Sequence, residues 1–110
     1  MKLPVTIVFR DLQPVSAIEE DIRRRVAKFD QFVPDAMSCH VVIESEGNRH
    51  RHGQRYTVRI DVRVPGEQIV AGDHHADADI ALAVRGAFEA MVRRLEDYAQ
   101  RRRGEVKPHR

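Results

Sequence analysis

Cysteine and long apolar runs are nearly absent from this sequence, and each absence excludes a class of protein. The single cysteine among the 110 residues, Cys39, can form neither an internal disulfide nor a cysteine cage for a metal. No stretch approaches the roughly 18 consecutive apolar residues of a membrane-spanning helix, and the N-terminus lacks the apolar core of a secretory signal. We therefore expect a cytoplasmic protein without a membrane partner, in which Cys39 is buried in the core.

The usual signatures of catalysis and nucleotide binding are also missing. The chain contains no P-loop, no GxGxxG or GxSxG motif and no CxxC pair. The sequence therefore predicts a protein that is not an enzyme, uses no cofactor or metal and has no small-molecule substrate.

Histidines provide the one alternative that involves chemistry, and four of them flank predicted strands: His50, His52, His74 and His75. If Val64 pairs with Glu67 across a tight turn, residue 72 lies opposite residue 59, which brings the two histidine pairs toward one end of the sheet. Imidazoles with nearby carboxylates would suit a borderline metal such as zinc. A histidine-dependent metal-binding or hydrolytic protein is therefore the alternative, beside an interpretation in which these histidines are simply solvated.

Aromatic residues are few, with four Phe, two Tyr and no Trp. Most of them fall on stripes that a core would bury, so we do not expect an exposed aromatic platform on which bases stack. If the chain binds nucleic acid, recognition of backbone and shape is what remains.

Four segments have the pattern of a β-strand. Apolar and polar side chains alternate strictly over residues 56–64, as in a strand with one exposed face, and over residues 3–10 Val5, Ile7 and Phe9 place apolar side chains on one face. Residues 39–44 are short and rich in β-branched side chains. The Pro65-Gly66 pair fits a type II turn and predicts a hairpin with a strand over residues 67–72.

A first helix is predicted over residues 16–33. Apolar residues recur there every three or four positions until Pro34 ends the run. Ser16 and Glu19 have the spacing of a capping box, in which the two side chains satisfy free amides of the first turn.

A second helix is predicted from about residue 80, with Asp77 and Asp79 supplying an N-cap and favourable negative charge. Its apolar stripe ends in an arginine run, and Gly104 is the expected stop. We expect residues 105–110 to be a frayed tail.

The order strand, helix, three strands, helix predicts an α+β fold. One domain over residues 1–104 would form a two-layer sandwich, in which a four-stranded sheet carries both helices on its apolar face. The opposite face, with Thr57, Arg59, Asp61 and Arg63, would be polar. A protein-interaction module using that face is a third interpretation, but the face lacks an apolar anchor.

The net charge is only +2, but the basic residues are concentrated toward the C-terminal end of the sequence. From residue 93 to residue 110 there are seven basic and three acidic residues, and only three of the 19 basic residues are lysines. Guanidinium groups suit bidentate phosphate contacts better than ammonium groups do. The distribution therefore favours RNA as a partner.

Helical positions sharpen this hypothesis. Arg24, Arg25 and Lys28 flank the apolar stripe of the first predicted helix, and Arg94 and Arg101, seven residues apart, flank that of the second on the equivalent side. Two such helices side by side would form a basic groove suited to an RNA backbone. The alternative is that these charges form i,i+4 pairs on solvated helices.

Several segments resemble the hibernation-promoting factor and ribosome-associated translation inhibitor family, also known as sigma-54 modulation proteins. The resemblance is carried by residues 17–30, 41–44 and 64–71 (VPGEQIVA). In the second helix, residues 79–84 (DIALAV) resemble the family's Asp-Met-Tyr-Ala-Ala-Ile, and residues 91–95 (MVRRL) resemble its Leu-x-Arg-Gln-Leu.

The resemblance implies a β-α-β-β-β-α fold similar to double-stranded-RNA-binding domains. It also implies docking between the head and body of the small ribosomal subunit, where the protein would bind ribosomal RNA, block messenger and transfer RNA, and so inhibit translation. Long members of the family carry a second domain that pairs ribosomes. We expect this chain to lack that domain, so it resembles a short form.

The family's basic helix positions correspond to Arg25, Lys28 and Arg93. Where the family carries Lys or Arg in the second helix, this chain has Ala90, Asp97 and Ala99, while arginines on neighbouring turns restore charge. The complete predicted RNA-binding set is Arg24, Arg25, Lys28, Arg93, Arg94, Arg101 and Arg102.

Overall fold

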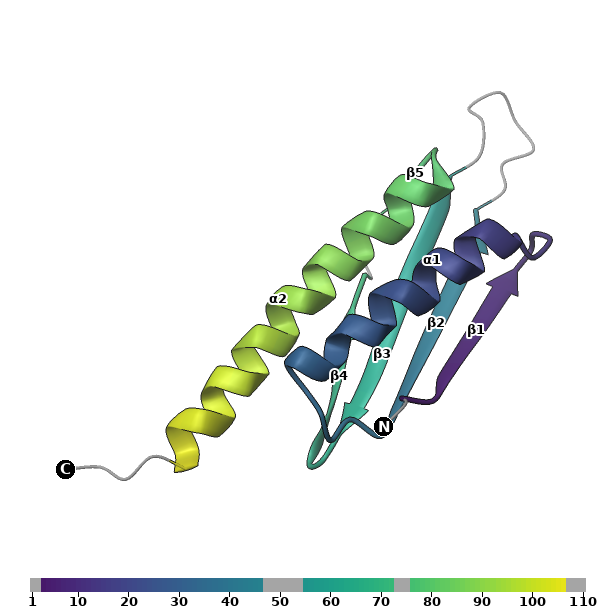
Figure 1. Cartoon of the computed structure of the whole chain (residues 1–110). Helices are drawn as coiled ribbons and strands as arrows, with labels where there is room; N and C mark the ends of the chain where they lie inside the picture. The colour runs from purple at the N-terminus through teal and green to yellow at the C-terminus, as the bar shows by residue number, and fades with distance from the viewer. Residues whose placement is uncertain (1–2, 47–54, 73–75, 107–110) are drawn as a thin grey trace.

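Two helices cover one face of a mixed β-sheet in a computed structural model that describes residues 3–46, 55–72 and 76–106 (Figure 1). The predicted α+β sandwich with the order β-α-β-β-β-α is confirmed. The elements are β1 (Val5–Arg10), α1 (Ser16–Ala27), the 3₁₀ turn η1 (Lys28–Gln31), β2 (Ser38–Ser45), β3 (Tyr56–Val64), β4 (Glu67–Ala71), the short β5 (Ala76–Asp77) and α2 (Ile80–Val106).

The sheet has the strand order β1-β2-β3-β4, with β1 parallel to β2 and the other neighbours antiparallel. Val64 pairs with Glu67 across the turn, as predicted. The short strand β5, which pairs with β3 through Tyr56 and Asp77, was not predicted. Two residues are too few for the periodicity of a strand to become visible.

The core lies between the sheet and the helices. Alternate residues of β3, from Val58 to Val64, are at most 2% exposed, and Cys39 is fully buried as predicted. The aromatic rings of Phe29 and Phe88 pack with centroids 5.7 Å apart and join η1 to α2. α2 packs on β3 and β4, while α1 lies beside it on the side of β1 (Figure 1).

The first helix begins at Ser16 as predicted, but its C-terminal end and its cap differ from the prediction. α1 ends at Ala27, and the chain tightens into η1 instead of continuing to residue 33. Pro34 disfavours helical geometry in the preceding residue, so the last turn closes with shorter-range bonds such as that from the Phe32 amide to the Phe29 carbonyl, 2.9 Å. The capping box is also absent, because the N-cap is Val15 and no side chain caps it.

Asp79 caps α2 as predicted, because its carboxylate accepts hydrogen bonds from the amides of Ala81 (2.9 Å) and Leu82 (3.4 Å). Asp77 contributes differently, from within β5, by accepting a 2.9 Å bond from the Asp79 amide. At its other end the helix passes through Gly104 and continues to Val106, so the predicted stop is wrong by two residues. Gly104 does not have the positive φ of a helix-terminating glycine.

Two other glycines do have a positive φ. Gly66, with φ 87°, occupies the third position of the predicted type II turn between β3 and β4. Gly72, with φ 100°, follows β4 where three backbones meet: a Cβ there would lie 2.0 Å from the Val58 carbonyl oxygen and 3.3 Å from the Ala87 Cβ. The close packing of β4, β3 and α2 therefore depends on Gly72.

None of the helices in the described ranges combines the length and the apolar character needed to span a bilayer.

Candidate nucleic-acid interface

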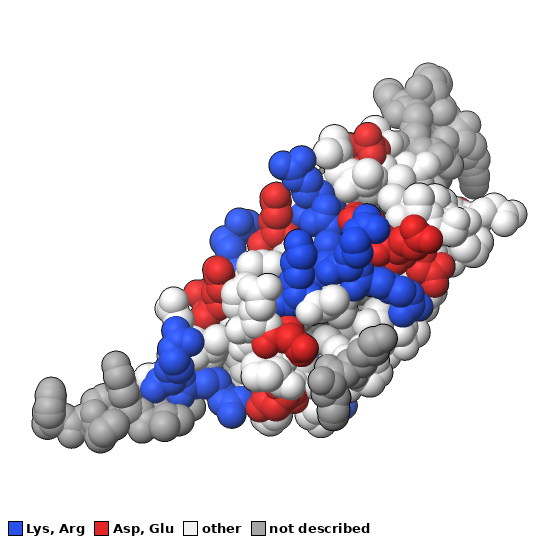
Figure 2. Space-filling model, viewed as in Figure 1, with Lys and Arg blue, Asp and Glu red and all other residues white. Residues whose placement is uncertain are grey.

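A hollow of about 320 Å³ opens between α1 with η1 on one side and α2 on the other. We call it the interhelical trough. Figure 2 shows basic side chains gathered over the middle of these two helices. The residues that line the trough are Arg25, Lys28, Phe29, Phe88, Glu89, Val92 and Arg93.

Helical periodicity places the cations of α1 and η1 at the trough. Ile18, Ile22 and Val26 face the sheet and are buried. Arg25 therefore projects from the flank of this stripe, and Lys28 follows it one turn later on the same flank. The tightening into η1 buries Phe29 completely, directly after Lys28, so that a core residue adjoins a charged rim.

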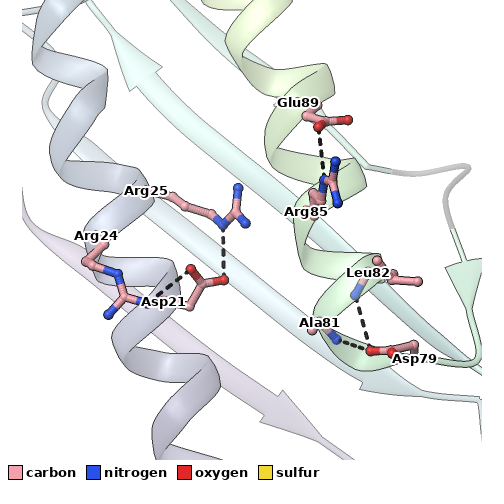
Figure 3. A network of polar contacts seen from close by, with 8 residues as sticks. All are labelled: Asp21, Arg24, Arg25, Asp79, Ala81, Leu82, Arg85 and Glu89. Atoms are coloured by element: carbon pink, nitrogen blue, oxygen red, sulfur yellow. Dashed lines mark hydrogen bonds and ion pairs between the residues drawn. The ribbon is translucent and has the colours of Figure 1, made fainter.

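Ion pairs within each helix hold several of these cations (Figure 3). On α1 the Asp21 carboxylate accepts hydrogen bonds from Arg25 at 3.0 Å and from Arg24 at 3.4 Å. On α2 the guanidinium of Arg85 lies 3.3 Å from the carboxylate of Glu89. The Arg25 pair is half-buried, whereas the pairs of Arg24 and Arg85 lie at the surface, where an ion pair contributes only about 0.2 to 1 kcal/mol. They orient the guanidinium groups without strong attachment, so an anionic ligand can compete for them.

Lys28 and Arg93 are different. Both are exposed and line the trough from opposite sides. Within residues 3–46, 55–72 and 76–106, neither has a hydrogen-bond or ion-pair partner. Their charges are therefore fully available to an anion between the helices.

Arg94 and Arg101 lie elsewhere, and their predicted place beside the groove is wrong. Arg101 reaches Glu67 of β4 at 3.5 Å, on the flank of α2 that faces away from α1. Because a seven-residue step is nearly two full turns, Arg94 lies on the same flank. The predicted sharing of a face was correct, but the flank that meets α1 carries Arg93 instead.

Arg102 belongs to a separate cluster near the C-terminal end of α2. It forms an ion pair with Asp35 at 3.4 Å and donates a hydrogen bond to the hydroxyl of Tyr98. This bond, followed by the negative charges nearby, raises the pKa of the guanidinium. The Tyr98 hydroxyl in turn donates to the Pro65 carbonyl at 3.3 Å. The cluster fastens α2 to the turn between β3 and β4, away from the trough.

Three groups of the trough region escaped prediction. Arg85 and Glu89 form an ion pair of α2 there. Val92 adds an apolar side chain to the lining of the trough. The i,i+4 spacing of Arg85 and Glu89 was a usable signal, but spacing does not decide which of two arginines a carboxylate selects.

The histidines of the alternative hypothesis, His50, His52, His74 and His75, lie outside the described residues. Within the described ranges no three His, Cys, Asp or Glu side chains come close enough to hold a metal ion. Asp77 and Asp79 follow the second histidine pair in the sequence, and their carboxylates accept hydrogen bonds from backbone amides at the start of α2.

The thiol of Cys39 is unreactive because it is buried in β2. Burial, with a smaller contribution from the charge of Asp61, raises the pKa of its thiol to about 12. The thiol is therefore protonated at neutral pH and is a packing group.

The outer face of the sheet has a mixed character. Arg59 and Arg63 are exposed there, as predicted for β3. A hollow of about 370 Å³ on this face also includes Val8, 37% exposed, and Val42. Two valines interrupt the polar surface but do not form a wide apolar patch.

A model of the family described as sigma 54 modulation protein / S30EA ribosomal protein matches residues 5–103. Among solved structures, a ribosomal subunit interface protein from Coxiella burnetii is similar at a TM-score of 0.70 with 14% identity, over 87% of this chain and 97% of that one. The N-terminal domain of Protein Y from Thermus thermophilus is similar at a TM-score of 0.66 with 18% identity, over 89% and 99%. At these identities the structures show the shared fold. No curated protein matches the sequence.

Proposed function

Because the chain belongs to the sigma 54 modulation protein / S30EA ribosomal protein family, we propose that this ribosome-associated protein inhibits translation by binding ribosomal RNA of the small subunit through the interhelical trough. The observation that carries the proposal is the position of Lys28 and Arg93, two exposed cations with no ion-pair partner among the described residues, on opposite walls of one trough. Residues 1–104 would form the binding unit.

Phosphate is the ligand that this arrangement suits. Arg25 and Lys28 present positive charge from one wall and Arg93 from the other, against the single carboxylate of Glu89. Each cation that contacts a phosphate releases condensed counterions, which favours binding and makes it sensitive to salt. Arg24, 69% exposed and held only by Asp21, would extend the contact along α1.

The arginines outside the trough have a lesser part in the proposal. Arg94 is exposed, but it lies on the β4 side of α2. Arg101 and Arg102 already face Glu67 and Asp35. RNA would have to displace these carboxylates, so we expect weaker contributions from the two arginines than from Lys28 and Arg93.

Inhibition in this proposal is steric. A folded domain that occupies RNA between the head and body of the small subunit excludes messenger and transfer RNA from the same space. The activity needs no nucleophile, metal or cofactor, and its compartment is the cytoplasm, where ribosomes work. Stationary phase or stress is the condition in which such silencing would be useful.

Neutralisation of the two unpartnered cations tests the proposal. The variant Lys28→Gln/Arg93→Gln should lose co-sedimentation with small subunits in gradients at moderate salt. The slope of log affinity against log salt should fall in magnitude by about 2, because two phosphate contacts are lost.

The matched control is Arg10→Gln/Arg63→Gln, which removes the same charge from the exposed outer face of the sheet. It should sediment with the subunits as the unaltered protein does. If both double variants lose binding equally, net charge and not the trough determines association, and the proposed site is wrong.

A further inference from the structure

The interhelical trough has an apolar floor, which a phosphate-binding cleft does not need. Phe29 and Phe88 lie at its base and Val92 on its α2 wall, below the charged groups of Arg25, Lys28 and Arg93. The alkyl stems of arginine and lysine are themselves apolar, with charge only at the tip. A ligand that fills the trough would therefore meet apolar surface below and positive charge above.

The trough is also large for a phosphate. Its volume of about 320 Å³ lies at the lower end of the range of small-molecule pockets. A phosphate group alone would leave the half-buried side chain of Val92 in contact with water. One nucleotide, with a flat apolar base and an anionic phosphate, matches both parts of the trough.

Glu89 adds a further constraint. A carboxylate at the rim disfavours an additional phosphate, but it can accept a hydrogen bond from the amino group of a base. Its guanidinium partner Arg85, at 3.3 Å, holds it in place from one turn earlier in α2. The trough therefore offers cations for a phosphate, an apolar floor for a base and one acceptor for the amino group of that base.

We propose that the interhelical trough takes up one unpaired nucleotide, with the base against Val92 and the apolar floor and the phosphate between Lys28 and Arg93. This inference rests on the proposed function and deepens it, because it makes the protein a reader of a bulged or looped nucleotide and not only of a helical backbone. The Phe29 and Phe88 rings pack against each other and are buried, so the base contacts Val92 and the alkyl stems of the flanking cations, and no open aromatic face is required.

The test uses the whole chain and two RNA hairpins of equal length. One hairpin carries 2-aminopurine as a single bulged nucleotide, and the other carries it in a base pair. The bulged hairpin should bind about tenfold more tightly, because its base buries apolar surface against Val92. The fluorescence of the bulged 2-aminopurine should change on binding, whereas that of the paired base should not. The fluorescence measurement requires no variant of the protein.

Val92→Phe is the informative substitution, because it fills the floor without changing charge. It should abolish the preference for the bulge, because the bulged hairpin should lose more affinity than the paired hairpin. Leu82→Phe, at a position of the same helix that is 46% exposed, is the matched control and should keep the preference. A preference that persists in Val92→Phe, with folding intact by circular dichroism, would overturn the proposal.

Adenosine 5′-monophosphate distinguishes the source of the nucleotide. If it binds free in solution and Val92→Phe weakens that binding, while the hairpins show no preference, the site serves a free nucleotide. Equal affinity for both hairpins, with no binding of the monophosphate, refutes the nucleotide site while the proposed RNA-binding function stands. If neither hairpin binds, the proposed function itself fails.

Discussion

Replacement of Gly72 by alanine should destabilise the fold far more than the same change at Gly66. Both glycines have a positive φ, 100° and 87°. For a residue with a side chain this conformation costs about 1 to 2 kcal/mol. The added Cβ at Gly66 would meet nothing within 4 Å, so Gly66→Ala should cost only that amount.

At Gly72 a second cost is added. The new Cβ would lie 2.0 Å from the carbonyl oxygen of Val58, a backbone atom in the central strand β3, and 3.3 Å from the Ala87 Cβ of α2. Neither neighbour can rotate away, so the end of β4 must separate from β3. We expect a total of at least about 3 kcal/mol, within the range of severe overpacking combined with backbone strain.

Urea denaturation followed by far-UV circular dichroism measures both variants against the unaltered protein. The difference between the two midpoints isolates the effect of the close approach, because the conformational strain is common to both. If Gly72→Ala unfolds at the same urea concentration as Gly66→Ala, the three backbones do not meet as described, and the packing of α2 over β4 is wrong.

Three further predictions concern the core and the surface. Phe88→Ala should lower the free energy of unfolding by about 3 to 5 kcal/mol, measured by urea denaturation, because a buried ring that packs on Phe29 is lost; a loss below about 1 kcal/mol would contradict the packing. Folding raises the pKa of the Cys39 thiol from 9.0 to about 12, so the thiol ionises at lower pH in the unfolded chain than in the folded protein. The free energy of unfolding should therefore fall by on the order of 1 kcal/mol per pH unit as the pH rises between these two values. Cys39→Ala should lack this decline. Asp35→Ala should change stability by less than about 1 kcal/mol in the same denaturation assay, since its pair with Arg102 is exposed; a larger loss would mean that this pair anchors α2.

Sequence patterns between near neighbours predicted most of the fold. Strict alternation in β3 identified the buried set from Val58 to Val64, and Pro65-Gly66 determined the hairpin register, because a turn with one positive φ fits few pairings. Asp79 was recognisable as a cap because its side chain acts on amides only two and three residues away. These features depend on near neighbours in the sequence.

The candidate site was harder to predict, because it depends on how two helices face each other. Periodicity showed that Arg94 and Arg101 share a face, but not that this face turns toward β4. Arg93 was reached through the family resemblance and not through the helical wheel. The change from α1 to η1 also escaped prediction, since the apolar spacing of Phe29 and Val33 suits a continuous α-helix as well as a tighter turn.

The walls of the interhelical trough come from segments far apart in the sequence, with Lys28 directly after α1 and Arg93 midway along α2. A nascent chain that has completed only β1, α1 and β2 therefore carries half of a binding site and no opposing cation. On the proposed function, an unfinished copy cannot silence the ribosome that is making it, and the capacity to bind arises only once synthesis has passed the second helix.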